Sequence, residues 1–170
     1  FLYGGYGTFD NMNGYFAGNQ YQVLDRLALQ KDQITQENIW GVADEDLYSM
    51  ALREFDHEAQ QGKPFFAHLM TTSNHRPYTF PENRIDQPQG NRDGAVKYTD
   101  WAIGDFLHRA QKHAWAKDTL FVIIADHCAS SAGKTEIPID GYHIPMIIWS
   151  PEHVTPQRID RLASQMDVAP

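Results

Sequence analysis

An uninterrupted apolar run in the second half of the chain constrains the fold most. Residues 119 to 125 read Thr-Leu-Phe-Val-Ile-Ile-Ala, and the run ends abruptly in Asp126 and His127. Apolar and β-branched residues without a polar interruption are typical of a strand that is buried on both faces. In open α/β sheets, ligands bind at the carboxyl ends of the central strands. The sequence therefore predicts a carboxylate and an imidazole at a ligand-binding edge.

Asp126 and His127 are candidate metal ligands. A carboxylate oxygen beside an imidazole nitrogen suits a borderline divalent ion such as Zn²⁺ or Mn²⁺. The alternative is a solvated loop start, in which Asp126 caps the segment that follows. The dipeptide alone does not decide between the two interpretations, because short motifs often match by chance.

The rest of the chain alternates between strand and helix patterns. The predicted elements are a strand end at 1–3, a short helix around 12–16, a helix with Asp44 as its N-cap and Gly62 as its stop, and a buried strand at 64–72. They continue with a helix capped by Asp93 whose apolar stripe comprises positions 95, 98, 102, 106 and 110, a strand at 119–125, a polar loop at 128–143, a strand at 145–149 and a helix at 156–166. Buried strands that alternate with helices indicate a mainly parallel sheet covered on both faces. We therefore expect an α/β fold, a three-layer α/β/α sandwich, with residues 1–170 forming one domain or most of one.

Composition excludes several classes of function. The net charge of −8 argues against nucleic acid, which requires a basic face, and against electrostatic adhesion to anionic lipid. One cysteine rules out an internal disulfide framework. No apolar run approaches the ~20 residues that cross a bilayer. Cys128 is expected to be inert packing and not a thiol nucleophile.

A series of segments carries a resemblance to a known family. In order, they are Tyr-Gly-Thr-Phe-Asp-Asn-Met-Asn at 6–13, Trp-Gly-Val-Ala-Asp-Glu-Asp-Leu at 40–47, Pro-Phe-Phe-Ala-His-Leu-Met-Thr-Thr-Ser-Asn-His-Arg-Pro-Tyr at 64–78, Ala-Val-Lys-Tyr-Thr-Asp at 95–100, Ala-Asp-His-Cys at 125–128, Tyr-His-Ile-Pro-Met-Ile-Ile at 142–148 and Ser-Gln-Met-Asp-Val-Ala-Pro at 164–170. Together they resemble the extracellular domain of lipoteichoic acid synthases and related phosphoglycerol transferases, in the alkaline phosphatase and sulfatase superfamily.

The resemblance implies an incomplete alkaline phosphatase-like domain and a phosphoglycerol transfer. A Thr or Ser nucleophile and an acidic metal ligand are expected upstream of Phe1. Asp126 and His127 would hold a divalent metal, Mn²⁺ first, with Zn²⁺ or Mg²⁺ as alternatives. The implied donor is the head group of phosphatidylglycerol, and the acceptor a glycan or a polyglycerol phosphate chain. Membrane spans before this domain would place the parent in the bacterial plasma (inner) membrane, with the domain on the periplasmic or extracellular side.

The resemblance also assigns substrate-binding residues. His75 follows the predicted strand at 64–72, where an imidazole is able to donate to a phosphate oxygen or pass a proton to an alkoxide. By resemblance His75 is both catalytic and substrate-binding; the alternative is a histidine that fixes its own loop through a backbone bond. Arg76 or Arg92 could replace the charge of a phosphate-binding family arginine that this chain lacks; the alternative for each is a solvated loop arginine. From its place just before the predicted strand at 145–149, His143 could face the site as an outer ligand or phosphate donor, or could equally satisfy the buried start of that strand.

Phe9 matches an aromatic residue that lies near the polar head of the substrate in the family. The pattern departs from lipoteichoic acid synthases close to it, where Asp10 and Met12 replace Trp and Arg, and Tyr3 replaces a histidine. Loss of a bidentate phosphate donor changes how the phosphoryl group is held. We therefore expect a different acceptor or pose.

Two other functions stay open at this stage. One is a hydrolase of the same fold, a sulfatase or phosphodiesterase, and the other is a non-catalytic binding domain. Among the other histidines, His68 is interpreted as a core residue, whereas His57, His108, His113 and His153 are expected on the surface.

Overall fold

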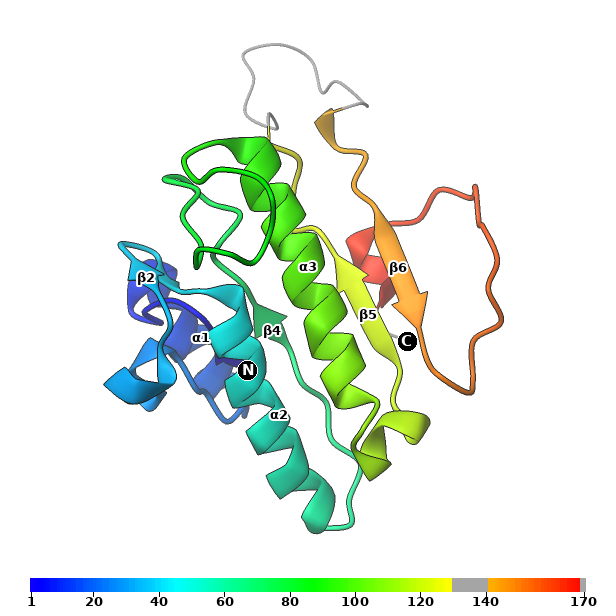
Figure 1. Ribbon diagram of the computed structural model, residues 1–170. Coiled ribbons are helices and arrows are strands. Elements are labelled where there is room, and N and C mark those ends of the chain that lie inside the picture. The colour runs from blue at the N-terminus through cyan, green and yellow to red at the C-terminus, as the bar shows by residue number, and fades with distance from the viewer. Residues whose placement is uncertain (130–140, 169–170) are drawn as a thin grey trace. The chain divides into compact units, whose positions relative to one another are not determined.

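The computed structural model describes residues 1–129 and 141–168, which form two compact units, Phe1–Trp115 and Ala116–Pro170. The first unit contains the helices α1 (Met12–Gly18), α2 (Asp44–Gln60) and α3 (Arg92–Ala110), and the strands β1 (Leu2–Tyr3), β2 (Glu37–Asn38), β3 (Gly41–Val42) and β4 (Leu69–Met70) (Figure 1). The second contains the strands β5 (Phe121–Ile124) and β6 (Met146–Trp149). No helix in the described ranges is long and apolar enough to cross a membrane. Part of the polar stretch at 128–143 lies outside the described residues.

A parallel strand pair organises the first unit. β1 and β4 pair in parallel, with Leu2 opposite Leu69 and Tyr3 opposite Met70. The ladder continues at the carboxyl ends, where the Gly4 N–H donates to the Met70 carbonyl over 3.0 Å. Because parallel strands end at the same edge, the loop after β1 and the loop after β4 emerge together. The parallel pairing of β1 and β4 agrees with the parallel sheet that the sequence predicts.

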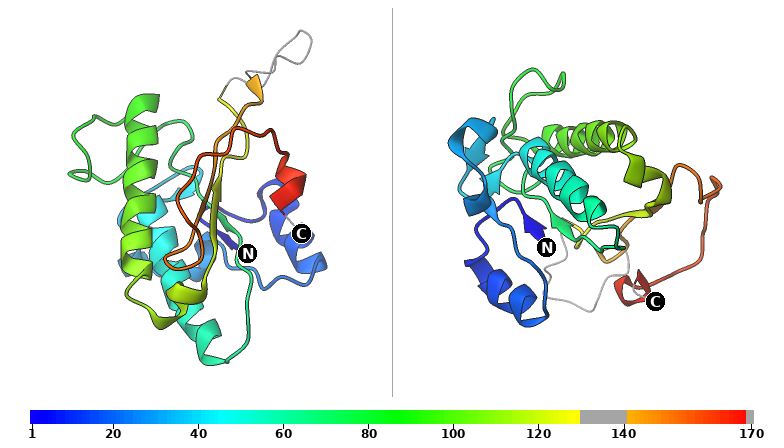
Figure 2. Two further views of the ribbon diagram at one scale, coloured as in Figure 1. Left: turned by 90° about the vertical axis from the view of Figure 1, so that its right-hand side faces the viewer. Right: turned by 90° about the horizontal axis from the view of Figure 1, so that it is seen from below.

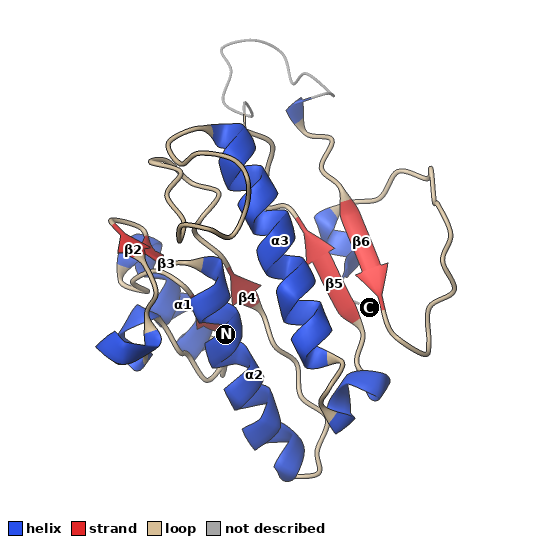
Figure 3. Cartoon of the chain, in the orientation of Figure 1, coloured by secondary structure: helices blue, strands red, loops and turns tan. Residues whose placement is uncertain are grey.

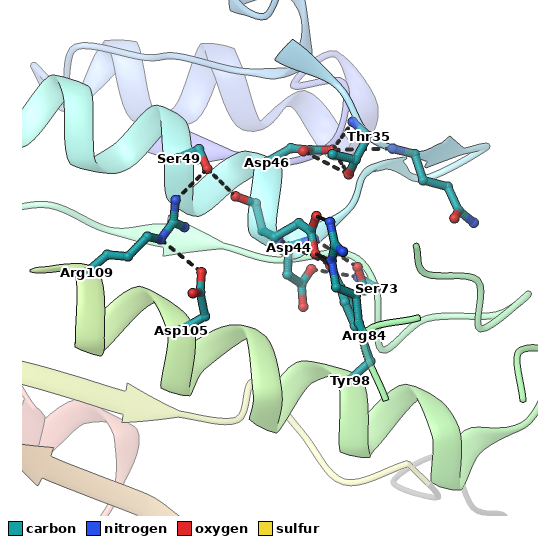
Figure 4. Close-up of polar contacts among 11 residues, drawn as sticks. Thr35, Asp44, Asp46, Ser49, Ser73, Arg84, Tyr98, Asp105 and Arg109 are labelled. Carbon is teal, nitrogen blue, oxygen red and sulfur yellow. Dashed lines mark hydrogen bonds and ion pairs between the residues drawn. The ribbon is translucent and has the colours of Figure 1, made fainter. Parts of the chain in front are cut away.

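Helices α2 and α3 lie side by side and supply most of the core of this unit (Figures 2 and 3). The predicted stripe of α3 is confirmed, since its members at positions 95, 98, 102, 106 and 110 are all buried. The rings of Tyr48 and Phe106 stack across the two helices at 4.7 Å. Each large apolar side chain buried in this way contributes about 1.5–3 kcal/mol. At the far end of α3, Arg109 donates to the Ser49 hydroxyl on α2 (Figure 4).

The helix termini differ partly from the prediction. Gly62, with a φ of 68°, follows α2 and ends it as expected. The N-cap of α2 is Ala43, not Asp44, and the N-cap of α3 is Asn91, whose side chain accepts from the Gly94 N–H. Asp93 instead lies in the first turn of α3, where its charge complements the helix dipole.

Asp44 is fully buried and connects three segments (Figure 4). Its Oδ1 accepts from the backbone N–H groups of Thr72 and Ser73, over 3.1 and 2.9 Å. Its Oδ2 accepts from the Thr99 hydroxyl, and its own N–H donates to the Ser73 Oγ. Burial raises the pKa of the Asp44 carboxyl, and these hydrogen bonds oppose the shift. The start of α2 is thereby tied to the loop after β4 and to α3.

The next two residues of α2 hold further loops. Glu45 receives two bonds from Arg84, over 2.8 and 2.9 Å, and the guanidinium also lies 5.6 Å from the Trp101 ring. Asp46 accepts from both the N–H and the hydroxyl of Thr35. Three consecutive carboxylates therefore fasten three different segments, and each is buried with its partners supplied.

The second unit departs from a purely parallel arrangement. β5 and β6 are antiparallel, with Phe121 opposite Trp149 and Ile124 opposite Met146. Burial of β5 on both faces was predicted, but Phe121 is buried whereas Val122 is 38% exposed. Within the described residues β5 pairs only with β6, so the strand is not enclosed as an internal strand would be.

Two predicted elements are shorter or absent. The strand expected at 64–72 is reduced to β4, because its ladder with β1 spans only two residues. The helix expected at 156–166 does not form; residues 156–164 are irregular and a 3-10 turn follows at Gln165–Val168. Ile159 and Leu162 are exposed there, at 68 and 85%, so no buried apolar face supports a helix.

Substitution of Asp44 tests the central network. Asp44→Ala leaves the buried N–H groups of Thr72 and Ser73 without an acceptor, at about 1–3 kcal/mol each. We expect the free energy of unfolding to fall by about 2–6 kcal/mol in urea denaturation followed by circular dichroism. Asp44→Asn keeps an acceptor oxygen and should lose less than half as much. The matched control is Asp93→Ala, an exposed carboxylate that should change stability little; an equal loss in both alanine variants would contradict the role of Asp44.

Candidate functional site

Three loops of the first unit meet at the carboxyl edge of the β1–β4 pair. The loop after β1 carries Phe9, the loop after β4 carries His75, and the β2–β3 hairpin contributes Trp40 at its turn. The Val42 N–H donates to the Gly4 carbonyl over 2.9 Å, which fastens the hairpin to the first loop. The arrangement follows from the parallel register, which brings both loops to the same edge.

Phe9, Trp40 and His75 form an aromatic cluster at this edge. The rings of Trp40 and His75 have centroids 3.9 Å apart with planes inclined by 44°. Phe9 stands edge-on to Trp40, with centroids 5.4 Å apart and planes at 90°. Phe9 is 47% exposed and His75 is also exposed, so the cluster faces solvent. Two residues predicted to contact substrate are thus brought together by a third, Trp40, to which sequence reasoning gave no role.

The imidazole of His75 has a defined hydrogen bond. Its Nδ1 lies 3.1 Å from the Arg76 carbonyl oxygen. Because a carbonyl only accepts, this bond requires a proton on Nδ1, so in the neutral imidazole Nε2 carries the lone pair. The backbone bond considered as an alternative role is therefore present, and it leaves the second nitrogen available for a substrate. Arg76 is exposed and forms no ion pair within the described residues.

Asp25 fixes the loop that carries Phe9. Its Oδ2 accepts from the Gly7 N–H and from the Asn13 amide, each over 3.0 Å, and its Oδ1 accepts from the Leu27 N–H. Burial alone would raise the pKa of this carboxyl, but the hydrogen bonds outweigh burial and hold the pKa below its ordinary value. The ionised form of Asp25 is therefore the form that orders the loop.

Glycine is required where the hairpin and the first loop touch. Gly41 has a φ of 148°, and a Cβ there would lie 2.1 Å from the Gly4 carbonyl oxygen. A Cβ on Gly5 would lie 2.4 Å from the carbonyl oxygen of Trp40. Only glycine permits backbones to approach so closely. The Trp-Gly dipeptide at 40–41 was therefore the sequence signal for this part of the site.

Asp126 and His127 lie at the carboxyl end of β5, as predicted. The Nδ1 of His127 is 2.8 Å from the Cys128 carbonyl oxygen, and its Nε2 is 3.4 Å from the Asp126 Oδ2. Both side chains are largely exposed, at 64 and 70%. The Cys128 thiol donates to the main-chain carbonyl of His143 over 3.4 Å, which brings the backbone at His143 beside this turn.

The geometry of this pair fits a divalent metal. A histidine ligand usually donates its other ring N–H to a carbonyl or carboxylate, as His127 does through Nδ1. Two donors that each lie about 2.1 Å from a tetrahedral ion are about 3.4 Å apart, which matches the separation of the Asp126 Oδ2 and the His127 Nε2. Within the described residues no group of three or more His, Cys, Asp or Glu is placed to hold a metal. A metal ion held by Asp126 and His127 would therefore need ligands beyond this pair.

The other candidate residues have different environments. Arg92 is the first residue of α3 and is exposed. His68 was interpreted as a core histidine, but it is exposed, with its ring edge-on to Phe1 and Phe16. The four histidines expected on the surface are exposed except one: His113 is half-buried, with its Nδ1 2.6 Å from an Asp56 carboxylate oxygen.

Comparison with known sequences gives consistent matches. The family profile described as Sulfatase matches residues 1–170. Phosphoglycerol transferase I of Xanthomonas campestris pv. campestris is 24% identical over 131 residues, which cover 73% of this chain and 19% of that protein. Lipoteichoic acid synthase of Staphylococcus saprophyticus is 26% identical over 137 residues, 74% of this chain and 20% of that protein. The chain thus spans about a fifth of the length of these curated relatives.

Solved structures agree on the fold. A protein in the alkaline phosphatase superfamily from Vibrio parahaemolyticus superimposes with a TM-score of 0.88 at 39% identity, over 95% of this chain and 40% of that one. The lipoteichoic acid synthase LtaP of Listeria monocytogenes gives a TM-score of 0.73 at 22% identity, over 91% of this chain and 44% of that one. The predicted fold class, an incomplete alkaline phosphatase-like α/β domain, is therefore confirmed.

The close approach at Gly41 generates a stability prediction. Gly41→Ala adds a methyl group against the Gly4 carbonyl, and overpacking of this kind costs about 1–3 kcal/mol beyond the strain of a positive φ. Gly62→Ala is the control, because Gly62 also has a positive φ but no atom lies within 4 Å of a Cβ there. Urea denaturation should show a larger loss for Gly41→Ala; equal losses would mean that the contact is readily relieved.

The pKa of Asp25 predicts a response to acid. Because this pKa is lowered on folding, the stabilisation is present above the unfolded-state pKa of about 3.9 and is lost as pH falls through the folded-state value. Measured between pH 6 and pH 3, the free energy of unfolding should fall less steeply in Asp25→Asn than in the wild type. Asp100→Asn, on the exposed side of α3, should leave the slope unchanged.

Proposed function

We propose that this chain, which belongs to the Sulfatase family within the alkaline phosphatase superfamily, is part of a metal-dependent enzyme that transfers phosphoglycerol. The observation that carries the proposal is the Asp126–His127 pair, an oriented oxygen and nitrogen donor at the carboxyl end of a strand. The names of the relatives, phosphoglycerol transferase I and lipoteichoic acid synthase, support this reaction class over others.

Asp126 Oδ2 and His127 Nε2 would hold a divalent ion, Mn²⁺ first, with Zn²⁺ or Mg²⁺ as alternatives. When bound, such an ion neutralises charge on the phosphoryl oxygens and lowers the pKa of an attacking hydroxyl. The hydroxyl is expected from a Thr or Ser upstream of Phe1. The Cys128 carbonyl keeps His127 in the tautomer whose Nε2 lone pair is free to bind a cation.

His75 would manage the proton of the transferred group. With its Nδ1 proton held by the Arg76 carbonyl, Nε2 is able to take a proton from an incoming acceptor hydroxyl and return it to a departing alkoxide. Phe9 would pack against the glycerol head group, while Arg76 and His143 would supply positive charge or a hydrogen bond to the phosphodiester. Asp10 is in the position that the resemblance gives to a tryptophan, so position 10 supplies no indole to the head-group site.

The proposed donor is a lipid with a phosphoglycerol head group, phosphatidylglycerol, and the acceptor belongs to the cell envelope. Met12 supplies no charge where lipoteichoic acid synthases have an arginine, so we favour single transfers to a glycan over growth of a polyglycerol phosphate chain. The parent protein is then proposed to lie in the plasma membrane, with this domain on the periplasmic or extracellular side. Hydrolysis of a sulfate or phosphate ester would use the same residues, with water as the acceptor.

Two variants of the full-length parent separate the proposed roles. His75→Ala should lower turnover of phosphatidylglycerol by about 10²-fold or more and leave metal content unchanged. Asp126→Ala should lower both turnover and metal content, measured by elemental analysis of the purified protein. The control is His57→Ala, an exposed histidine on α2 that should change neither.

The products of the wild-type reaction decide the substrate class. Phosphoglycerol attached singly to a glycan supports the proposal, whereas long polyglycerol phosphate chains contradict the role given to Met12. Free glycerol phosphate as the sole product would identify a hydrolase. A fall in metal content in His75→Ala with turnover intact would make His75 a ligand and overturn its assignment.

A further inference from the structure

Trp40 is the central member of the aromatic cluster. Its indole contacts both other rings, with His75 at 3.9 Å and Phe9 at 5.4 Å. Aromatic pairs usually have centroids 4.5–7 Å apart, so the contact with His75 is an unusually close one. The indole therefore lies against the imidazole and is itself in contact with the Phe9 ring.

The backbone of Trp40 is held on two sides. Its main-chain N–H donates to the Asn38 Oδ1 over 2.8 Å, and the Asn38 amide donates in turn to the Thr79 hydroxyl over 2.9 Å. Its carbonyl oxygen packs against Gly5, where no side chain would fit. Thr79 follows His75 in the loop after β4, and before His75 the Thr72 hydroxyl donates to the Val42 carbonyl of the hairpin over 2.9 Å, so the hairpin and this loop are joined on both sides of the ring contact.

His75, in contrast, has little else to orient its ring. The side chain is exposed, and its hydrogen bond to the Arg76 carbonyl is to the adjacent residue, which moves with the same loop. The anchor that Asp44 provides ends at Ser73, two residues earlier. Within the described residues, the indole of Trp40 is therefore the group outside this loop that restricts rotation of the imidazole.

We propose that Trp40 is the positioning residue for His75: its indole holds the imidazole so that Nε2 is presented to the substrate oxygen, and it contributes no group to the reaction itself. The proposal rests on the proposed function, because the proton transfer assigned to His75 is the step that it serves. A catalytic group displaced by about 1 Å loses up to 10²-fold in rate, so loss of the indole should lower kcat.

The test is a double-mutant cycle in the full-length parent with phosphatidylglycerol as substrate. Trp40→Leu should lower kcat by about 10- to 10²-fold with KM changed less than about twofold. Trp40→Phe restores a flat ring and should recover most of the rate. In the His75→Ala background, Trp40→Leu should lower kcat less than about twofold further, because residues that act through each other are not additive. Tyr15→Leu, an exposed aromatic residue on α1, is the control.

Two kinetic results would overturn the proposal. Equal losses of kcat in the presence and absence of His75 would show that Trp40 acts independently, and a raised KM with kcat unchanged would show that it binds substrate directly. Urea denaturation of each variant separates these outcomes from simple unfolding.

A readout without activity keeps this inference separate from the proposed function. In NMR spectra, the His75 ring protons should move when Trp40→Leu removes the ring current of the indole, and should broaden as the imidazole samples several rotamers. Unchanged His75 signals would overturn the proposal whatever the activity. If the wild-type parent transfers nothing from phosphatidylglycerol while the His75 signals respond as expected, the proposed function fails and the positioning contact stands.

Discussion

One buried carboxylate determines how the first unit is assembled. Asp44 accepts from two backbone N–H groups of the loop after β4 and from a hydroxyl on α3, so three segments distant in sequence converge on a single side chain. Removal of a charged group from water is costly, and only a nearly complete set of donors offsets that cost. The loop that carries His75 therefore has a rigid start, and whatever freedom remains lies beyond Ser73.

The site depends on a second constraint, the close approach of backbones at the edge of the β1–β4 pair. Gly5 and Gly41 let the hairpin pack onto the first loop without a side chain between them. This contact fixes the position of the Trp40 backbone, and the indole of Trp40 then contacts the His75 ring. Asp25 acts in the same way on the loop of Phe9. Polar anchors and glycines thus fix the backbone, and aromatic contacts then orient the exposed side chains.

Local patterns were predictable from the sequence, and non-local ones were not. The stripe of α3 was predicted in full, because helical spacing is a property of the segment itself. Asp44 looked like an N-cap, yet its oxygens serve residues 28 and 29 positions away, a partnership that no local pattern reveals. The terminal helix at 156–166 failed for the related reason that its apolar residues have nothing to pack against in the described chain. Trp40 was overlooked because its role arises only where separate loops meet.

His75 and His127 share the same hydrogen bond to the backbone and differ in the side chain beside the ring. In each, Nδ1 donates to the carbonyl of the following residue, which selects the tautomer of the neutral imidazole in which Nε2 carries the lone pair. Beside the Nε2 of His127 lies the Asp126 carboxylate, and two donors of this kind favour a cation. Beside His75 lies the indole ring of Trp40, which offers no metal ligand. The same side-chain type thus has a carboxylate neighbour in one unit and an aromatic neighbour in the other, and this difference underlies the separate roles proposed for the two histidines.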